Sequence, residues 1–297
     1  MLLLHHSREP PSQLWPNVPP TIDIWVIGSG PVETFYPHAP ALGWEEQPDN
    51  LGNMATGVMA YGLTSVVIGS TIIAISGLAT TPNVESFDTN HAELGWVEHS
   101  TLVAKRYDHS SVVVGTRIFV IGGMDWIPFI PIATVEVFDT ANPGAGWVMQ
   151  AADLTTPRLC HTSIVVGSRI FVIGGKVNEG GTGVSSMEVL DTVNEGLGWV
   201  VDPATLNTGR SNHAASVVGT QIYVTGGSLN TVYTAFVEVF DTGNPGLGWI
   251  YQPSLNSARY KHASAVVGTF IFAIGGYVDS GSSTSSVEAF DTANPGL

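Results

Sequence analysis

The chain has a single cysteine among its 297 residues, Cys160, and few basic side chains. One cysteine cannot form an intrachain disulfide, so side-chain packing and backbone hydrogen bonds must hold the fold together. Lysine and arginine number 10 against 25 aspartates and glutamates, which gives a formal net charge of -15. Because nucleic acids and anionic membranes attract proteins with a surplus of basic side chains, we expect neither as a partner.

Long apolar runs are also missing. No stretch reaches the roughly 18 to 20 apolar residues of a membrane-spanning helix. The apolar residues 1–4 are followed at once by His5 and His6, whereas a secretory signal needs roughly 7 to 15 apolar residues in a row. We therefore expect a soluble protein, cytoplasmic by default, although a leader that had been removed would leave the same sequence, and the compartment stays open.

Helical periodicity is absent, and the 34 glycines and 18 prolines indicate a chain dense in turns. In its place, an apolar run that ends in a pair of small residues occurs six times. The pairs begin at residues 28, 76, 122, 174, 226 and 275, at intervals of 46 to 52 residues. A repeat of this length predicts an array of similar structural units.

The residue pattern within each unit predicts four antiparallel strands. In the third unit, residues 109–114 and 118–121 are β-branched and aromatic runs joined by Gly115-Thr116, which suits a tight hairpin turn. The phrase Val-Glu-Val-Phe-Asp at 135–139 forms the third strand, and a Gly-Trp pair opens the fourth. A single sheet of this kind cannot bury both apolar faces, but six sheets stacked around an axis can, so we expect a β-propeller.

Four units also carry an Arg-x-x-His motif ahead of the glycine pair, at 106–109, 158–161, 210–213 and 259–262. Together with the glycine pair, the Val-Glu-x-Phe-Asp strand and the closing Trp, the motif resembles the kelch repeat. The resemblance covers residues 21–297 and is weaker in the first two units, where Ser29 and Ser76 replace glycines and Ala60 and Leu63 occupy the Arg and His positions of the second unit. It implies an all-β fold, a kelch-type β-propeller of six four-stranded blades.

The Pro-rich segment 1–20 precedes the propeller predicted for residues 21–297. The last unit stops before its Gly-Trp pair, so one interpretation places the segment around Trp15 in the last blade as its fourth strand. That strand would close the ring, as terminal strands of kelch propellers often do, and leave the first blade one strand short. The alternative is that the chain is a fragment of a longer ring, which the prolines favour because they suit a linker better than a paired strand.

Some polar residues recur once per unit, and we expect them to be structural. The Glu of the constant phrase shares a strand face with a Phe, so it needs a buried partner, and the repeated Arg is the natural one. A residue required in every blade rarely serves a single binding site. The predicted structural residues are Arg106, His109, Arg158, His161, Arg210, His213, Arg259 and His262.

The loops between second and third strands vary and should lie on one rim, where loops on a rigid scaffold carry recognition. Residues 124–130 place Trp126 and Phe129 where water is expected, which favours a contact site; the alternative is that this loop folds over its own blade as a small core. The rim residues predicted to bind are Trp126, Phe129, Tyr233, Phe236 and Tyr277. The resemblance to peptide-binding kelch propellers adds the third position of each Arg-x-x-His motif, which is Asp108, Cys160, Asn212 and Lys261.

No catalytic, metal-binding or cofactor-binding residues are predicted. Glu85, Asp88 and His91 resemble the metal ligands of iron-dependent specifier proteins of the kelch group, but Glu85 and Asp88 should face opposite sides of one strand. Copper chemistry of the galactose-oxidase type needs a cysteine joined to a tyrosine, and Cys160, the sole cysteine, belongs to the repeat.

The expected function is therefore noncatalytic: a kelch propeller that acts as a scaffold and binds a protein or peptide on its variable rim. The alternative is a small-molecule or carbohydrate enzyme similar to the sialic acid mutarotases, with its site in the central pocket. Two repeated arginines open to one cavity would favour the enzyme, so enzymatic activity is left undecided, with the noncatalytic interpretation preferred. A third interpretation, a self-associating structural role, leaves the oligomeric state open.

Overall fold

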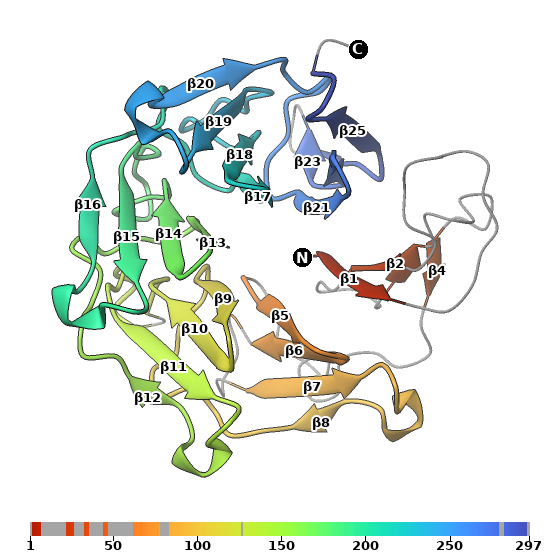
Figure 1. Cartoon of the computed structure of the whole chain (residues 1–297), viewed down its shortest axis with the longest axis vertical. Helices are drawn as coiled ribbons and strands as arrows, with labels where there is room; N and C mark the ends of the chain where they lie inside the picture. The colour runs from red at the N-terminus through yellow and green to blue at the C-terminus, as the bar shows by residue number, and fades with distance from the viewer. Residues whose placement is uncertain are drawn as a thin grey trace.

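The computed structural model in Figure 1 describes residues 62–295 apart from 76, 78–82, 126 and 279–281, together with the backbone of four strands before residue 62. Six antiparallel sheets follow one another along the chain and surround a centre, which confirms the predicted β-propeller. None of the helices in the described part has the length and apolar character that a bilayer-spanning segment requires.

The blades have the following strands. Blade one contains β1 (Leu2–His6), β2 (Ile22–Val26), β3 (Glu33–Phe35) and β4 (Trp44–Glu46). Blade two contains β5 (Thr64–Ile68), β6 (Thr71–Ile75), β7 (Val84–Asp88) and β8 (Val97–Glu98). Blade three contains β9 (Ser110–Val114), β10 (Arg117–Ile121), β11 (Val135–Asp139) and β12 (Val148–Met149).

Blade four contains β13 (Thr162–Val166), β14 (Arg169–Ile173), β15 (Met187–Asp191) and β16 (Val200–Asp202). Blade five contains β17 (Ala214–Val218), β18 (Gln221–Thr225), β19 (Val237–Asp241) and β20 (Trp249–Gln252). Blade six contains β21 (Ala263–Val267), β22 (Phe270–Ile274) and β25 (Val287–Asp291), with a ribbon of β23 (Tyr277–Val278) and β24 (Ser282–Ser283) in its variable loop.

Short 3-10 helices precede the fourth strand in blades two to five: η2 (Ala92–Leu94), η3 (Pro143–Ala145), η4 (Glu195–Leu197) and η5 (Pro245–Leu247). The first strand of each blade is the innermost, and β1, β5, β9, β13, β17 and β21 contact one another in turn around the ring. Because successive strands run in opposite directions, the loops before the first strand and after the second strand share one rim. The turns after the first and third strands share the other.

The prediction that the first blade lacks one strand was wrong. Strand β1 pairs with β2 in antiparallel register from Leu2 opposite Val26 to His6 opposite Ile22, so the first sheet has four strands. The residues Leu2–His6 near the start of the given sequence thus form a five-residue strand. Three strands of blade six are described, and Trp15 lies outside the described residues, so its place in that blade stays a prediction.

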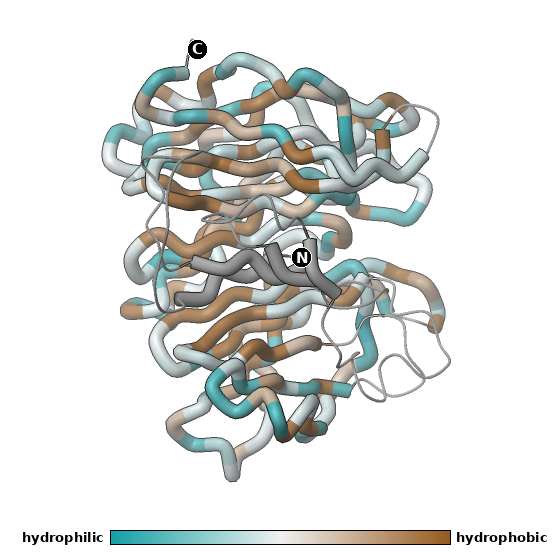
Figure 2. Tube along the Cα trace, turned by 90° about the vertical axis from the view of Figure 1, so that its right-hand side faces the viewer, coloured by the Kyte–Doolittle hydropathy of each residue, from teal (hydrophilic) through white to brown (hydrophobic). Residues whose placement is uncertain are grey.

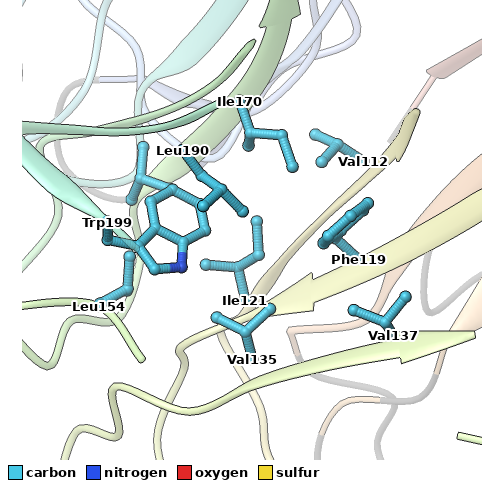
Figure 3. Close-up of a cluster of buried hydrophobic side chains, with 10 residues drawn as sticks. Val112, Phe119, Ile121, Val135, Val137, Leu154, Ile170, Leu190 and Trp199 are labelled. Atoms are coloured by element: carbon cyan, nitrogen blue, oxygen red, sulfur yellow. The ribbon is translucent and has the colours of Figure 1, made fainter. Parts of the chain in front are cut away.

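The core lies between the blades, where the strands present two apolar faces. In the second strand of blade three, the four residues Ile118 to Ile121 are fully buried. Figure 3 shows side chains from β9, β10 and β11 that meet Ile170, Leu190 and Trp199 of blade four. In Figure 2 the hydrophobic segments run through the stacked strands, and hydrophilic segments lie mostly at turns and edges. Burial of each such side chain contributes roughly 1.5–3 kcal/mol, so the interfaces hold the rims in place.

Candidate functional site

The repeated arginines are buried, and each is paired with a glutamate of its own blade. Arg106 is 1% exposed, and its Nη2 donates to Glu136 Oε1 at 2.7 Å, while Nη1 donates to the carbonyl oxygens of Gly122 and Thr134. Burial lowers the pKa of the Arg106 guanidinium, and Glu136 opposes that shift. The same pairing occurs in the next three blades, between Arg158 and Glu188, Arg210 and Glu238, and Arg259 and Glu288.

The repeated histidines join neighbouring blades. The Nε2 atom of His109 lies 2.9 Å from Thr64 Oγ1 of blade two, and that of His161 lies 2.8 Å from Ser110 Oγ of blade three. His213 makes the equivalent bond to Thr162 at the start of β13, and His262 bonds to Thr225 at the end of β18, so each partner lies in the preceding blade. Since each imidazole is buried and bonded across an interface, the histidines act here as links between blades.

The positions of the glycine pairs leave no room for a Cβ atom, because a repeated histidine and backbone carbonyl groups lie against them. A Cβ atom at Gly123, whose φ is +99°, would lie 2.8 Å from the carbonyl oxygen of Tyr107 and 2.9 Å from Cβ of His109. A Cβ atom at Gly122 would lie 2.8 Å from the carbonyl oxygen of Arg158 in the next blade. Only glycine fits such positions, so each variable loop leaves its blade from the same place.

The four variable positions of the Arg-x-x-His motifs come together in one ring around the centre. Cys160 N–H donates to Asp108 O at 2.9 Å, Asn212 N–H to Cys160 O at 2.9 Å, and Lys261 N–H to Asn212 O at 2.8 Å. We call Asp108, Cys160, Asn212 and Lys261 the inner ring. Each stands two residues or fewer before an innermost strand, so the ring lies at one end of the propeller axis.

Backbone strain is concentrated in the inner ring. The four residues have φ angles of 51° to 53°, in the left-handed region that Asp and Asn tolerate and that Cys and Lys rarely adopt. Left-handed residues other than glycine cost roughly 1–3 kcal/mol each and gather at functional sites. The hydrogen bonds between neighbouring blades hold this conformation, so one strained residue from each of four blades lies at the same end of the axis.

The thiol of the inner ring remains protonated at neutral pH. Burial raises the pKa of Cys160, and the Asp108 carboxylate raises it further, while Lys261 acts in the opposite direction. A thiolate is the nucleophilic form of cysteine, so this environment disfavours nucleophilic catalysis by Cys160.

Three tyrosines stack beside the inner ring on the same rim. The rings of Tyr233 and Tyr260 have centroids 4.1 Å apart at an angle of 16°, and those of Tyr260 and Tyr277 have centroids 5.3 Å apart. A hydrogen bond with Tyr233, followed by burial, raises the pKa of Tyr260 to about 12. We call Tyr233, Tyr260 and Tyr277 the tyrosine stack; it spans blades five and six, and its central member, Tyr260, precedes Lys261 in the chain.

Sequence reasoning missed Tyr260, the central member of the stack, and Tyr107, its counterpart in blade three. Both occupy the second position of an Arg-x-x-His motif, which varies between units as the third does. Burial, followed by Glu179 and Asp108, raises the pKa of Tyr107 to about 12. The variability of the second position was therefore the signal that could have found both.

The remaining predicted rim residues lie in other places. Phe129 is 47% exposed in a loop whose Ile127 is 72% exposed, and Trp126 lies outside the described residues. Phe236 packs edge-on against Tyr251 of β20, with centroids 5.6 Å apart, so it belongs to the outer part of its blade. The structure thus gathers Tyr233 and Tyr277 but not Phe236, and the binding role of all these residues stays a prediction.

The metal arrangement considered from the sequence does not form a cluster. Asp88 accepts a hydrogen bond from the backbone of Asn90, and His91 lies 3.4 Å from Glu93 at the surface, while Glu85 is buried in β7. Within the described residues, His, Cys, Asp and Glu side chains form no group of three or more that could hold a metal ion.

A comparison with protein-family models finds a match over the part of the chain that contains most of the Arg–Glu pairs and the glycine pairs. A family model described as the KLHDC2/KLHL20/DRC7 Kelch-repeats domain matches residues 62–276. The chain belongs to the kelch-repeat family. This family membership accounts for the recurrence of the buried network in blades three to six.

Curated relatives of this kelch propeller include Kelch domain-containing protein 3 of Bos taurus and of Homo sapiens. Each is 26% identical over 183 residues, which is 57% of this chain and 47% of the relative. The Rho GTPase-activating protein gacHH of Dictyostelium discoideum is 30% identical over 137 residues, which is 41% of this chain and 8% of that protein. The chain thus spans about half or less of the length of the curated relatives it matches. A solved structure described as "Structure of YjhT" has a TM-score of 0.74 at 14% identity over 90% of both chains, a likeness of fold.

Proposed function

We propose that this kelch propeller is a noncatalytic scaffold that binds a protein or peptide segment on the rim formed by the inner ring and the tyrosine stack. The observation that carries the proposal is the chain of three backbone hydrogen bonds that links Asp108, Cys160, Asn212 and Lys261 across blades three to six. These positions differ from blade to blade, whereas the residues that build the scaffold repeat. Variable side chains on a constant frame are the usual basis of recognition.

The chemistry of the two features suits a peptide. Asp108, Asn212 and Lys261 offer an acceptor, an amide and a cation for the polar groups of a backbone or a chain end. The tyrosine stack offers a flat apolar surface with hydroxyl groups, and tyrosine is enriched among residues that dominate protein interfaces. A segment with a polar end and an apolar or aromatic side chain would use both.

The enzyme alternative receives less support. A carbohydrate enzyme with its site in the central pocket needs free Arg and Glu side chains there. The guanidinium groups of the four repeated arginines are 0–1% exposed and are paired with glutamates, so they are occupied by the scaffold. The likeness to YjhT concerns the fold and adds no site residue.

A peptide display experiment tests the proposed rim. Random linear peptides selected on the intact propeller are expected to lose about ten-fold or more in affinity when Tyr260→Ala or Lys261→Ala removes a contact. The matched control is Leu197→Ala, because Leu197 is 77% exposed in η4 on the opposite rim. A variant with Trp126 and Phe129 changed to Ser tests the neighbouring loop.

Fluorescence polarisation with the selected peptides gives the affinities, and circular dichroism confirms that each variant is folded. Peptides that bind the wild type and both rim variants equally, or that lose affinity only with Leu197→Ala, would contradict the proposal.

A further inference from the structure

Blades two and three enclose a pocket on the rim opposite the inner ring. Its volume is about 390 Å³, and its wall reaches the buried core residues Ile73, Val84 and Ile118. Phe138 and Trp147 of blade three form the facing wall. The pocket therefore lies between two blades and reaches their buried core. Figure 1 shows the strands β6, β7, β10 and β11 that surround it.

The repeat itself explains why the pocket exists at this interface. Blade two has Thr71, Ile73 and Ser86 on one face, because Ile73 is opposite Ser86 in the β6–β7 register and Thr71 is two residues along β6. The corresponding positions carry larger side chains in blades three to five, and in blade six only the counterpart of Ile73 is larger. The counterparts of Ile73 are Phe119, Phe171, Tyr223 and Phe272, and the counterparts of Ser86 are Val137, Val189, Val239 and Ala289.

At the interface between blades three and four, larger side chains fill the position that corresponds to the pocket. Between blades three and four, Phe119 fills the core, as Figure 3 shows, and leaves a more polar hollow nearer the surface. Arg117 crosses that hollow to Glu195 at 2.6 Å, and Gln150 donates to Glu195 at 3.2 Å. In blade two the position of Arg117 is Thr71, and in blade three the position of Glu195 is Pro143, so no ion pair spans the pocket.

The wall of the pocket combines an apolar body with one hydrogen-bonding pair. Seven of its eleven lining residues are apolar, and no Lys, Arg, Asp or Glu is among them. Ser86 Oγ and His99 Nε2 lie 2.6 Å apart at one side. A cavity of roughly 150 Å³ holds benzene, and pockets for small molecules begin near 300 Å³. The space therefore fits a neutral molecule of two or three rings.

We propose that this pocket binds a small, uncharged, ring-bearing molecule with a hydroxyl group that hydrogen-bonds to the Ser86–His99 pair. The rings occupy the space vacated by the aromatic residue of the repeat, between Ile73 and the Phe138–Trp147 pair, whose centroids are 5.4 Å apart. Because the pocket opens on the rim opposite the inner ring, its occupation does not depend on the peptide-binding proposal.

A fluorescence titration with 2-naphthol, which has two rings and one hydroxyl, tests the pocket at pH 7. The wild-type protein is expected to bind the probe saturably. Ile73→Phe and Ser86→Val restore the side chains of the other blades and should each lower the affinity about ten-fold or more, because they fill the space. His99→Ala should lower it several-fold through the lost hydrogen bond.

The matched control is Ala289→Val, which introduces the same side chain at the same repeat position of blade six, where Ala289 is exposed. It should leave the affinity for 2-naphthol unchanged. Absence of saturable binding to the wild type, or equal affinity of the wild type and both filled variants, would overturn the proposal. If Ile73→Phe does not fold, as judged by circular dichroism, Ser86→Val alone decides.

Discussion

Replacement of Glu188 by Ala is expected to lower the free energy of unfolding by about 3–5 kcal/mol, because it leaves the Arg158 guanidinium buried without its anionic partner. Both side chains are 0% exposed, and Arg158 Nη2 donates to Glu188 Oε1 at 2.6 Å. Glu188 also accepts hydrogen bonds from the backbone N–H groups of Thr155 and Thr156, which would lose them. Urea denaturation at pH 7 gives the change in stability.

A second ion pair, which joins blades three and four, provides the control. Arg117 and Glu195 lie 2.6 Å apart, yet their side chains are 31% and 32% exposed. Exposed pairs contribute roughly 0–1 kcal/mol, so Glu195→Ala should change stability little although the distance is the same. Equal losses for Glu188→Ala and Glu195→Ala would show that burial does not decide the strength of these pairs.

The double variant Arg158→Met with Glu188→Leu extends the argument. Removal of both charges eliminates the unpaired cation, and replacement of buried ion pairs by apolar side chains is often neutral or stabilising. The double variant should therefore be more stable than Glu188→Ala alone. A double variant that is no more stable would mean that the hydrogen bonds to the backbone carbonyls of Gly174 and Ser186, and not the charge balance, dominate the loss.

Most of the scaffold could be predicted from the sequence, because the same motif residues recur in successive blades. The pairing of Arg106 with Glu136 follows from a carboxylate that shares a strand face with apolar residues, and the structure places it as expected. The position of Leu2–His6 in the first sheet was harder to predict, since five apolar and histidine residues form no repeat of their own. The sequence analysis instead assigned the segment around Trp15 to a strand, because a tryptophan opens the fourth strand of other blades.

The variable features follow less directly from the sequence. The inner ring was predicted because Asp108 and its counterparts occupy one position of a motif. Tyr233 and Tyr277 were predicted as residues of one rim, but Tyr260 was missed, because the three tyrosines come from three segments that meet only when the loops of blades five and six fold. The two smaller residues that form the pocket, Ile73 and Ser86, are visible when the repeats are compared. The sequence alone does not show that their strand face meets the next blade, so it does not predict a pocket there.

Stability is also expected to fall steeply between pH 6.5 and pH 5 because of the buried histidines. Burial, followed by the nearby arginines, lowers the pKa of His109, His213 and His262 to about 3, and burial lowers that of His161 well below its usual value. An unfolded histidine takes up a proton near pH 6.5. Their contribution to stability is therefore fully present above about pH 6.5 and is lost progressively as the pH falls toward 3.

Each buried histidine should lower the free energy of unfolding by roughly 1 kcal/mol per pH unit in this range, so the four together have a large effect. Carboxylates titrate mostly below about pH 5, which leaves the histidines as the main groups in this window. Urea denaturation at pH 7, 6 and 5 measures the slope of the unfolding free energy against pH, which gives the number of protons taken up on unfolding when divided by about 1.4 kcal/mol. A stability that is independent of pH between 7 and 5 would contradict the assignment of four neutral, buried imidazoles.

A single substitution separates this effect from a general acid sensitivity. His213→Gln removes one imidazole and keeps a polar side chain near Thr162, whose Oγ1 lies 2.9 Å from His213 Nε2. The variant should be less stable at pH 7, because the ring that packs against Gly174 is lost, but its pH slope should be smaller by about one proton. Leu197→Ala is the control, since Leu197 is 77% exposed and carries no ionisable group, so its replacement should leave the slope unchanged. The difference between these two slopes, rather than the loss at any one pH, identifies the links between blades as the acid-sensitive element of the ring.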